Sequence, residues 1–304
     1  MRLVGLFDLA TGVWIDAATA PFRSSERNLC RKLWRHVSAG DTIVADSGFC
    51  CWFTLYLFRQ RGVKVVMRIN SIRKADPRAA KLGKGDRLER WRKPNIRPKW
   101  VAASDYAEMP DSIAIRVVTV AVDPGSGFRT SELQLASTVL DLEEMAATEI
   151  GSLYLARWKV ELFIDDLKTT LGMAVLTSRS PAMIRRELLV HIIAYNLLRA
   201  LMTCGKTAGC ENPSFKGTID RLSHWLPSVL SVTPATMRKR MVTDLIELIA
   251  EDQVPERPFR REPRAVKRRP KPHQLLNKPR HEMVEISHRS RYKKGKPEII
   301  TNNP

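Results

Sequence analysis

The sequence predicts an α/β fold, and three observations support this class. Apolar runs and helical periodicities alternate as strand, helix, strand, helix, strand within residues 1–69. Two further apolar runs between residues 113 and 140 predict a hairpin. Beyond residue 140, apolar residues recur at helical spacing to about residue 250. The predicted parts are the first part of the core at 1–69, a β-rich insertion at 70–140, a helical second part of the core at 141–253 and a basic, proline-rich tail at 254–304.

The first part begins with a hairpin and continues as the alternating pattern. Ser24 and Ser25 are suitable N-terminal caps for the first helix, and Gly40 ends it. Asp46 directly follows the next strand, at the carboxyl end where ligand sites of α/β sheets gather. The predicted elements are strands Arg2–Leu9 and Val13–Asp16 around the turn Ala10–Gly12, a helix from Ser24 to Gly40, a strand at Thr42–Ala45, a helix at Cys51–Gln60 and a strand at Val63–Ile69.

The insertion and the helical part follow. Residues 70–111 are basic and show little periodic apolar pattern. Next, Ile113–Val122 and Glu132–Leu140 flank a turn at Pro124–Gly127, which predicts a hairpin. The predicted helices are one capped by Asp141, a long one over Leu153–Leu171 ended by Gly172, one over Ala182–Met202 and a last pair between Phe215 and Ala250.

The charge of the chain is strongly positive. It has 51 Lys and Arg against 32 Asp and Glu, a net charge of +19, and a pI of about 10.1. Such an excess favours a polyanionic partner, with nucleic acid first and an anionic membrane second. We expect no membrane association, because no basic amphipathic helix and no uninterrupted stretch of 18 apolar residues occurs. Five cysteines without zinc-ligand spacing predict a reduced, cytoplasmic chain without structural metal.

The tail holds much of this charge. From Val254 to Pro304 there are 15 Lys and Arg against 5 Glu, a net +10. Six prolines from Pro255 to Pro279 are incompatible with a helix or a central strand, so we predict a disordered tail. It is either a solvated basic tail or a strip that contacts phosphates of a nucleic-acid backbone, and charge alone does not separate the two.

One predicted helix carries a line of polar side chains. On an ideal α-helix, Tyr154, Arg157, Glu161 and Lys168 fall within a sector of about 60°. One interpretation is a solvated face with an i,i+4 pair between Arg157 and Glu161. The other is phosphoryl transfer on DNA, in which a carboxylate binds a divalent metal while cations and a phenol hold phosphates. Two-metal chemistry needs further carboxylates, and Asp46 is the natural second one.

The same residues resemble a known family. The spacing Tyr154-x2-Arg157-x3-Glu161-x6-Lys168 matches the Y-R-E-K signature of the IS-four family of bacterial insertion-sequence transposases. Further similar segments are Ala45–Phe49, like the stretch around the family's second catalytic aspartate, Tyr195-Asn-Leu-Leu-Arg199, like its Y-N-x-x-R stretch, and Arg261–Lys271, like its basic C-terminal segment. The resemblance covers nearly the whole chain.

The resemblance implies a DDE transposase that cuts and joins DNA. It implies an RNase H-like catalytic core with a β-rich insertion and two magnesium ions, for which manganese can substitute. Asp46 and Glu161 would be catalytic metal ligands, and Tyr154, Arg157 and Lys168 would contact phosphates at the transposon end. The implied partners are double-stranded DNA, as terminal repeats and as target, and a second subunit in an end-paired homodimer. The implied location is the bacterial cytoplasm, at the nucleoid.

One part of the family pattern is missing. The family's first catalytic aspartate lies on a strand that precedes the segment matching Arg2–Leu9, so we expect the core to lack its first strand. Asp8 is the nearby carboxylate that could replace it, although its strand is not the expected one. The simplest explanation is a chain without its N-terminal part, through decay, a frameshift or a mis-assigned start. The alternative functions are therefore an incomplete, DNA-binding transposase remnant and a basic nuclease of the same fold.

Overall fold

The structure is a computed structural model, and it describes most of the chain. The described residues are 1–73, 76–122, 132–207, 209–210 and 212–254, with short pieces at 282, 285–286 and 299–300. The predicted turn at Pro124–Gly127 and nearly all of the predicted tail lie outside them. One compact unit consists of Met1–Val120 and Gln134–Pro255. A second unit, Ala121–Leu133 with Glu256–Pro304, includes two short antiparallel strands, β9 (Glu285–Ile286) and β10 (Ile299–Ile300).

The predicted N-terminal hairpin is confirmed. β1 (Arg2–Phe7) and β2 (Trp14–Ala20) pair as an antiparallel two-stranded sheet. α1 (Glu26–Leu33) packs on this hairpin through Leu29 and Leu33. The short helix η1 (Trp34–His36) follows α1 and ends the predicted helical segment.

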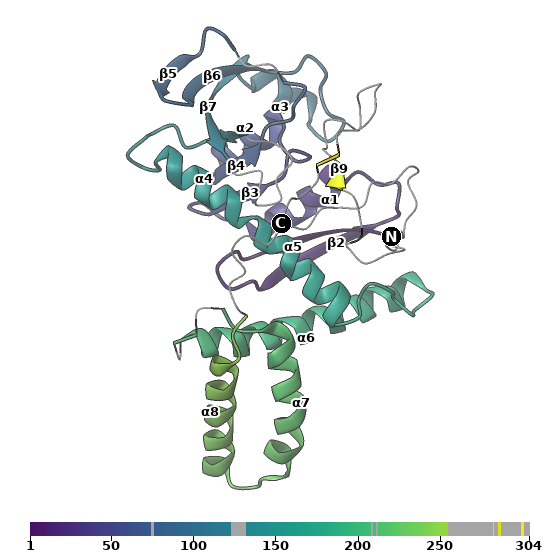
Figure 1. Ribbon diagram of the computed structural model, residues 1–304. Coiled ribbons are helices and arrows are strands. Elements are labelled where there is room, and N and C mark those ends of the chain that lie inside the picture. The colour runs from purple at the N-terminus through teal and green to yellow at the C-terminus, as the bar shows by residue number, and fades with distance from the viewer. Residues whose placement is uncertain are drawn as a thin grey trace. The chain divides into compact units, whose positions relative to one another are not determined.

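A six-stranded mixed sheet forms the larger layer of this unit (Figure 1). β3 and β4 are parallel because α2 returns the chain to the starting end, as a parallel pair requires. The four strands from the predicted insertion extend the same sheet, since β8 pairs antiparallel with β4. In spatial order the strands are β3 (Thr42–Ala45), β4 (Lys64–Arg68), β8 (Glu132–Ser137), β7 (Ser112–Ala121), β6 (Asp86–Arg92) and β5 (Ala80–Gly83).

The main core lies on one face of this sheet. α2 (Trp52–Gln60) buries its aromatic and aliphatic side chains against β4 and β7, and α3 (Ala103–Glu108) contributes Tyr106 at the rim. Trp52 Nε1 donates to the carbonyl of Trp91 (2.9 Å), so the indole fills the core without leaving a polar atom unpaired. The packing of α2 on the sheet thus fixes the end of β3 that Asp46 follows.

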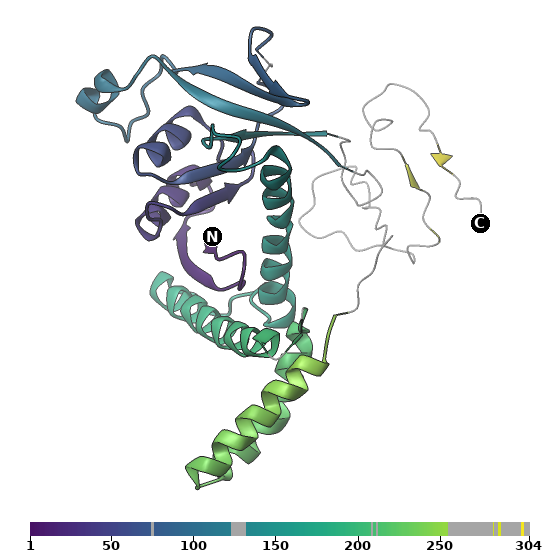
Figure 2. The same ribbon diagram turned by 90° about the vertical axis from the view of Figure 1, so that its left-hand side faces the viewer.

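The helix predicted over Leu153–Leu171 is not continuous, which corrects that prediction. It begins earlier and is divided into α4 (Ala147–Ala156), α5 (Trp158–Asp165) and the π-helical turn η3 (Asp166–Thr170). The predicted cap at Asp141 is also wrong, because that carboxylate accepts from the Glu143 N–H in a preceding turn (2.9 Å). Glu149 caps α4 instead, accepting from the Ala146 N–H at 2.7 Å. Figure 2 shows α4 and α5 running in line past β3, β4 and the hairpin.

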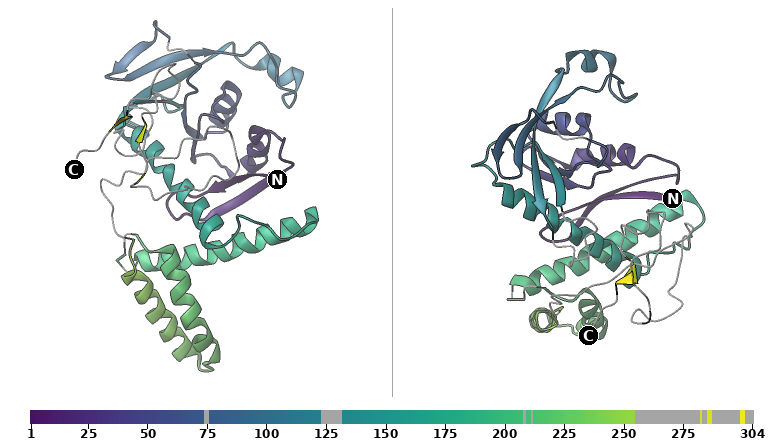
Figure 3. Two further views of the ribbon diagram at one scale, coloured as in Figure 1. Left: turned by 45° about the vertical axis from the view of Figure 1, so that its right-hand side comes forward. Right: turned by 45° about the horizontal axis from the view of Figure 1, so that its top comes forward.

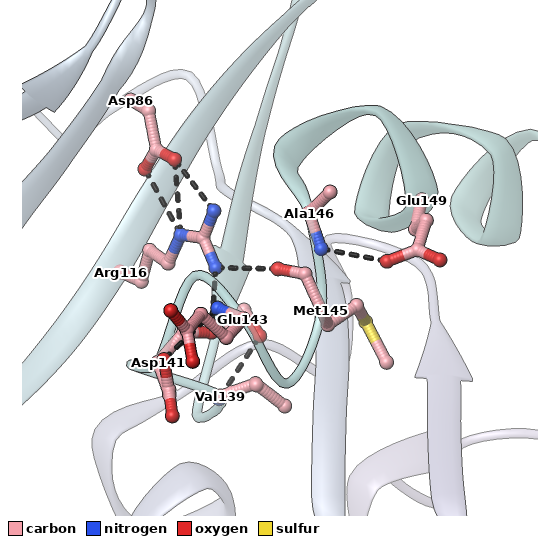
Figure 4. A network of polar contacts seen from close by, with 9 residues as sticks. Asp86, Arg116, Val139, Asp141, Glu143, Met145, Ala146 and Glu149 are labelled. Atoms are coloured by element: carbon pink, nitrogen blue, oxygen red, sulfur yellow. Dashed lines mark hydrogen bonds and ion pairs between the residues drawn. The ribbon is translucent and has the colours of Figure 1, made fainter.

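A buried arginine fixes the loop that leads into α4 (Figure 4). Arg116 on β7 is fully buried and pairs with Asp86 on β6, at 2.6 Å between Nη2 and Oδ2. Its Nη1 donates to the carbonyls of Met145 (2.7 Å) and Asp141 (3.2 Å). The strands of the predicted insertion therefore anchor the start of the helix that carries the polar line.

The C-terminal helices confirm the prediction for this region. α6 (Pro181–Thr207) builds a second core with α5 and the hairpin. α7 (Phe215–Ser231) and α8 (Ala235–Glu251) form a helical pair that projects from α6 (Figure 3). Among the described residues, α6 is the one helix long and apolar enough, by length and composition, to cross a membrane. The core helix of a soluble protein passes the same test. In this structure α6 buries Tyr195 and Arg199, and Arg199 is ion-paired.

Candidate active site

Asp46 stands where the sequence predicts it, immediately after β3. Its side chain is exposed, and its Oδ1 accepts from the backbone N–H of Ser47 at 2.7 Å. Because β3 and β4 are parallel, with Ala45 opposite Met67, the next residues along the two strands are Asp46 and Arg68. The carboxyl ends of the two strands therefore bring an acid and a base to the same sheet edge.

Tyr154 connects this edge to α4. Its ring is buried, and burial is the main cause that raises the pKa of its hydroxyl. Arg157 opposes that shift, Asp46 adds to it and Arg68 again opposes it. All three charged groups therefore lie within electrostatic reach of one phenol. Asp46, predicted at the carboxyl end of β3, and Arg157, predicted on the helix, thus both influence the Tyr154 hydroxyl.

Arg157 joins Glu161 to this group. It occupies the break between α4 and α5, and its guanidinium lies 5.6 Å from the centre of the Tyr154 ring. Its Nη2 pairs with Glu161 Oε1 at 3.2 Å. Its Nε is buried and lacks a hydrogen-bond partner among the described residues. An unsatisfied, buried guanidinium nitrogen is costly, and a phosphate oxygen is the kind of acceptor that would satisfy it.

Lys168 is placed differently from the other predicted residues. It is exposed and lies in the π turn η3, where the angular positions of an ideal α-helix no longer apply. Within the part of the chain that the structure describes, its side chain forms no hydrogen bond or ion pair with Glu161 or Arg157. Its orientation therefore depends on what holds η3, which sequence spacing alone did not reveal.

The carboxylates present fit magnesium in part. Asp46 and Glu161 offer exposed or half-exposed oxygen ligands, and magnesium is commonly bound by one or two carboxylates together with substrate phosphates. Among the described residues, no group of three His, Cys, Asp or Glu side chains could hold an ion. Asp8 lies in the hairpin turn, where its Oδ1 accepts from both the N–H and the hydroxyl of Thr11 at 2.7 Å. These bonds lower the pKa of Asp8 and close the hairpin turn.

Arg68 is a candidate that sequence reasoning missed. It ends β4, half-buried, beside Asp46 and within reach of Tyr154. The signal was available, because a cation that ends the strand parallel to Thr42–Ala45 must lie at the same sheet edge as Asp46.

Asp166, which begins η3, gives a prediction for pH. Burial raises the pKa of its carboxyl to about 6, although the Arg199 guanidinium opposes the shift from 2.6 Å. Because the folded pKa lies above the ordinary value of 3.8, Asp166 adds stability below about pH 4, and this is lost as the pH rises through about 6. We expect the free energy of unfolding of the wild type, relative to Asp166→Asn, to fall between pH 4 and pH 7. Urea unfolding at several pH values measures this, and a difference independent of pH would contradict the assignment.

Comparisons with known proteins relate the chain to transposases. The family model for the transposase DDE domain matches residues 1–197. The chain is 25% identical over 278 residues to the transposase InsG for insertion sequence element IS4 of Escherichia coli strain K12. That alignment covers 89% of this chain and 60% of the relative, so the chain spans about 60% of the length of this curated relative. A solved piggyBac transposase synaptic complex with hairpin DNA matches at 10% identity and a TM-score of 0.43, covering 80% of this chain and 50% of that one.

The family match covers the sheet edge with Asp46, the helices with Tyr154, Arg157 and Glu161, and the turn with Lys168. It extends over more than half of the chain and agrees with the similarity to the IS4 transposase. The chain belongs to the transposase DDE domain family.

Proposed function

We propose that this chain is the catalytic part of an insertion-sequence transposase that cuts DNA and joins the cut strand to a target by metal-dependent phosphoryl transfer. The observation that carries the proposal is geometric: Asp46 follows β3 and Arg68 ends β4 at the same end of the two strands, Arg157 lies over the Tyr154 ring, and Glu161 pairs with Arg157. Acidic ligands next to cations, one with a buried unpaired nitrogen, suit a metal ion and a phosphate backbone together. The parallel strands β3 and β4, with α2 between them, support an RNase H-like core.

Each residue has a proposed role. Asp46 and Glu161 hold magnesium, or manganese in its place. When bound, the metal polarises the scissile phosphate and lowers the pKa of the attacking water. Arg157 and Arg68 hold phosphate oxygens, and the Tyr154 hydroxyl orients one of them. Lys168 contacts the backbone further along the transposon end.

The partners follow from the same proposal. Double-stranded DNA binds as the terminal repeats of the element and as the target, and two copies pair the two ends. The site of action is then the nucleoid, where the DNA lies. The net charge of +19 supports DNA as the partner through counterion release.

A DNA-binding remnant without cleavage activity is the second candidate function. The small number of metal ligands favours it. Among the described residues no group of three possible ligands occurs, and a two-metal centre needs more than the two carboxylates Asp46 and Glu161. Both candidates predict DNA binding, so only cleavage separates them.

Cleavage of DNA that flanks the gene tests the proposal. The 304-residue chain, and the same chain preceded by the reading frame upstream of Met1, are incubated with 40-base-pair duplexes tiled across the flanking DNA. Strand cuts at one position that require magnesium or manganese, and that stop with EDTA, support the transposase. Metal-independent binding without any cuts by either form would leave the remnant as the function.

The two cations on the helix are expected to contribute to binding. Arg157→Ala and Lys168→Ala should each weaken binding to the tightest of these duplexes by about tenfold, because each removes one phosphate contact of about 1–2 kcal/mol. Lys216→Met is the matched control, since it removes one charge of the exposed pair with Asp220. Fluorescence anisotropy measures the Kd values. Equal Kd values for all four proteins would exclude this helix from the DNA path.

Removal of the tail after Val254 tests the other basic segment. The truncated protein should bind DNA more weakly and with a shallower dependence of log Kd on log salt concentration, because fewer counterions are released. Its thermal unfolding should not change, since the core clusters of the described residues lie within residues 1–254. Identical salt slopes for both proteins would show that the tail does not contact DNA.

A further inference from the structure

The segment Tyr195-Asn-Leu-Leu-Arg199 has no role in the site described above. It lies in α6 with its polar side chains turned inward, because Tyr195 is fully buried and Arg199 is 8% exposed. The buried face of a helix does not need an arginine for packing. A buried guanidinium is costly unless hydrogen bonds or an ion pair compensate for its lost hydration. The partners of Arg199 indicate what the segment does.

Arg199 contacts the helix that follows Glu161. Its Nη2 pairs with Asp166 Oδ2 at 2.6 Å, and its Nε donates to the Tyr195 hydroxyl at 2.9 Å. Its guanidinium also lies 4.5 Å from the centre of the Phe163 ring and 5.1 Å from that of Phe215. The charge is therefore enclosed between aromatic rings and directed at a single carboxylate.

The same segment also forms hydrogen bonds with the N-terminal hairpin. The Tyr195 hydroxyl donates to the carbonyl of Gly12 at 2.8 Å. The Asn196 side chain bridges the backbone of Trp14, accepting from its N–H and donating to its carbonyl, both at 2.9 Å. Gly12 has a φ of +77°, and a Cβ there would lie 3.0 Å from Phe163 and 3.2 Å from Arg199 Nε, so only glycine fits. Helix, hairpin and π turn are thus joined by one set of side chains.

Asp166 is the residue that begins the π turn. The turn is closed by the Leu171 N–H donating to the Asp166 carbonyl at 3.0 Å, and the Met173 N–H donates to the Leu167 carbonyl at 3.1 Å. A π turn takes in one more residue than an α turn, so the side chains beyond Asp166 rotate away from the positions that an unbroken α-helix would give them. Lys168 is two residues beyond Asp166, so anchoring Asp166 sets the direction in which Lys168 leaves the helix.

We propose that Tyr195 and Arg199 are positioning residues that, through Asp166 and the π turn, orient Lys168 relative to Glu161 on the DNA path. This inference rests on the proposed phosphate contact of Lys168. Neither residue touches DNA, and both act by fixing the turn. The Y-N-x-x-R segment is then the support of the Y-R-E-K helix.

The test combines hydrogen exchange with a double-mutant cycle, using the full chain at pH 8, above the pKa of Asp166. Tyr195→Phe keeps the ring but removes the hydroxyl, so it should fold even if Arg199→Met does not. We expect exchange of the amides of Leu171–Ala174 to accelerate about tenfold in Tyr195→Phe, because the local opening energy falls. The amides of α4 should exchange at the wild-type rate.

DNA binding then shows whether the turn acts through Lys168. With a 30-base-pair duplex from the flanking DNA, Tyr195→Phe should weaken binding about three- to tenfold in the wild-type background and leave binding unchanged in Lys168→Ala, as coupled residues do. Arg199→Lys, which retains the charge facing Asp166, should recover part of the loss caused by Arg199→Met. Thr203→Val is the matched control. It removes the hydrogen bond that the Thr203 hydroxyl donates to the Arg199 carbonyl but leaves the Arg199 side chain unchanged, so it should change neither readout.

The outcomes distinguish the phosphate contact of Lys168 from the positioning role of Tyr195 and Arg199. If Lys168→Ala binds as well as the wild type, the proposed phosphate contact fails, and exchange at the turn still decides whether Tyr195 and Arg199 fix the π turn. If Lys168→Ala weakens binding and Tyr195→Phe weakens it equally in both backgrounds, the positioning role is overturned. Unchanged exchange at Leu171–Ala174 in Tyr195→Phe overturns it as well.

Discussion

Replacing Glu161 by Gln is expected to lower metal-dependent DNA cleavage by on the order of a thousandfold or more. The amide keeps the size of the carboxylate but removes the negative charge that we propose binds magnesium. DNA binding should stay within about threefold of the wild type or become tighter, because Arg157 loses the carboxylate that now pairs with it at 3.2 Å. Cleavage rates and Kd values are measured on the form of the protein that cuts.

Asp165→Asn is the matched control for this prediction. It removes one negative charge from the same helix, at an exposed carboxylate that accepts from the Thr169 hydroxyl at 2.8 Å. Its cleavage rate should stay within about threefold of the wild type, as for a surface substitution away from the site. If both variants cut at the wild-type rate, Glu161 is not a metal ligand. If both lose cleavage equally, the loss reflects the charge of the helix rather than a ligand at Glu161.

Much of the fold could be predicted because it follows from local pattern. The hairpin at the N-terminus, the strand before Asp46 and the last three helices have strong periodicity or clear capping residues, and all are present. The prediction of one continuous helix over Leu153–Leu171 was wrong, and its π turn is held by a tertiary contact. The Asp166–Arg199 pair is available for the π turn only once α6 has packed, and residues 33 positions apart carry no local signal of it.

The candidate site was likewise predictable only where local sequence pattern defines it. Asp46, Arg157 and Glu161 could be proposed from a strand end, a helical spacing and a family signature. That Asp46, Arg157 and Arg68 all act electrostatically on Tyr154 could be seen only in the tertiary structure. The pairing of Arg116 with Asp86 was also beyond sequence reasoning, because the basic composition of residues 70–111 made any one acid in it look like a surface residue.

Breaking that pair is expected to have the largest effect on stability. Arg116→Met should lower the free energy of unfolding by about 3–5 kcal/mol, since it leaves the Asp86 carboxylate buried without its partner. Asp86 is 4% exposed and accepts three bonds from Arg116 at 2.6 to 3.1 Å. The carbonyls of Met145 and Asp141 lose their donor as well. Urea unfolding measures the change, and a loss below about 1 kcal/mol would show that water replaces the guanidinium.

The double variant Asp86→Val with Arg116→Met separates charge from anchoring. With both charges removed, most of the lost stability should return, because an apolar pair replaces a buried ion pair at little net cost. Arg90→Met, an exposed arginine on the same strand as Asp86, should change stability by no more than about 0.5 kcal/mol. The loop before α4 stays without its donor in the double variant, so the amides of Ala147–Gly151 should still exchange faster than in the wild type. Wild-type exchange there would mean that Arg116 stabilises the sheet but does not hold the helix that carries Tyr154.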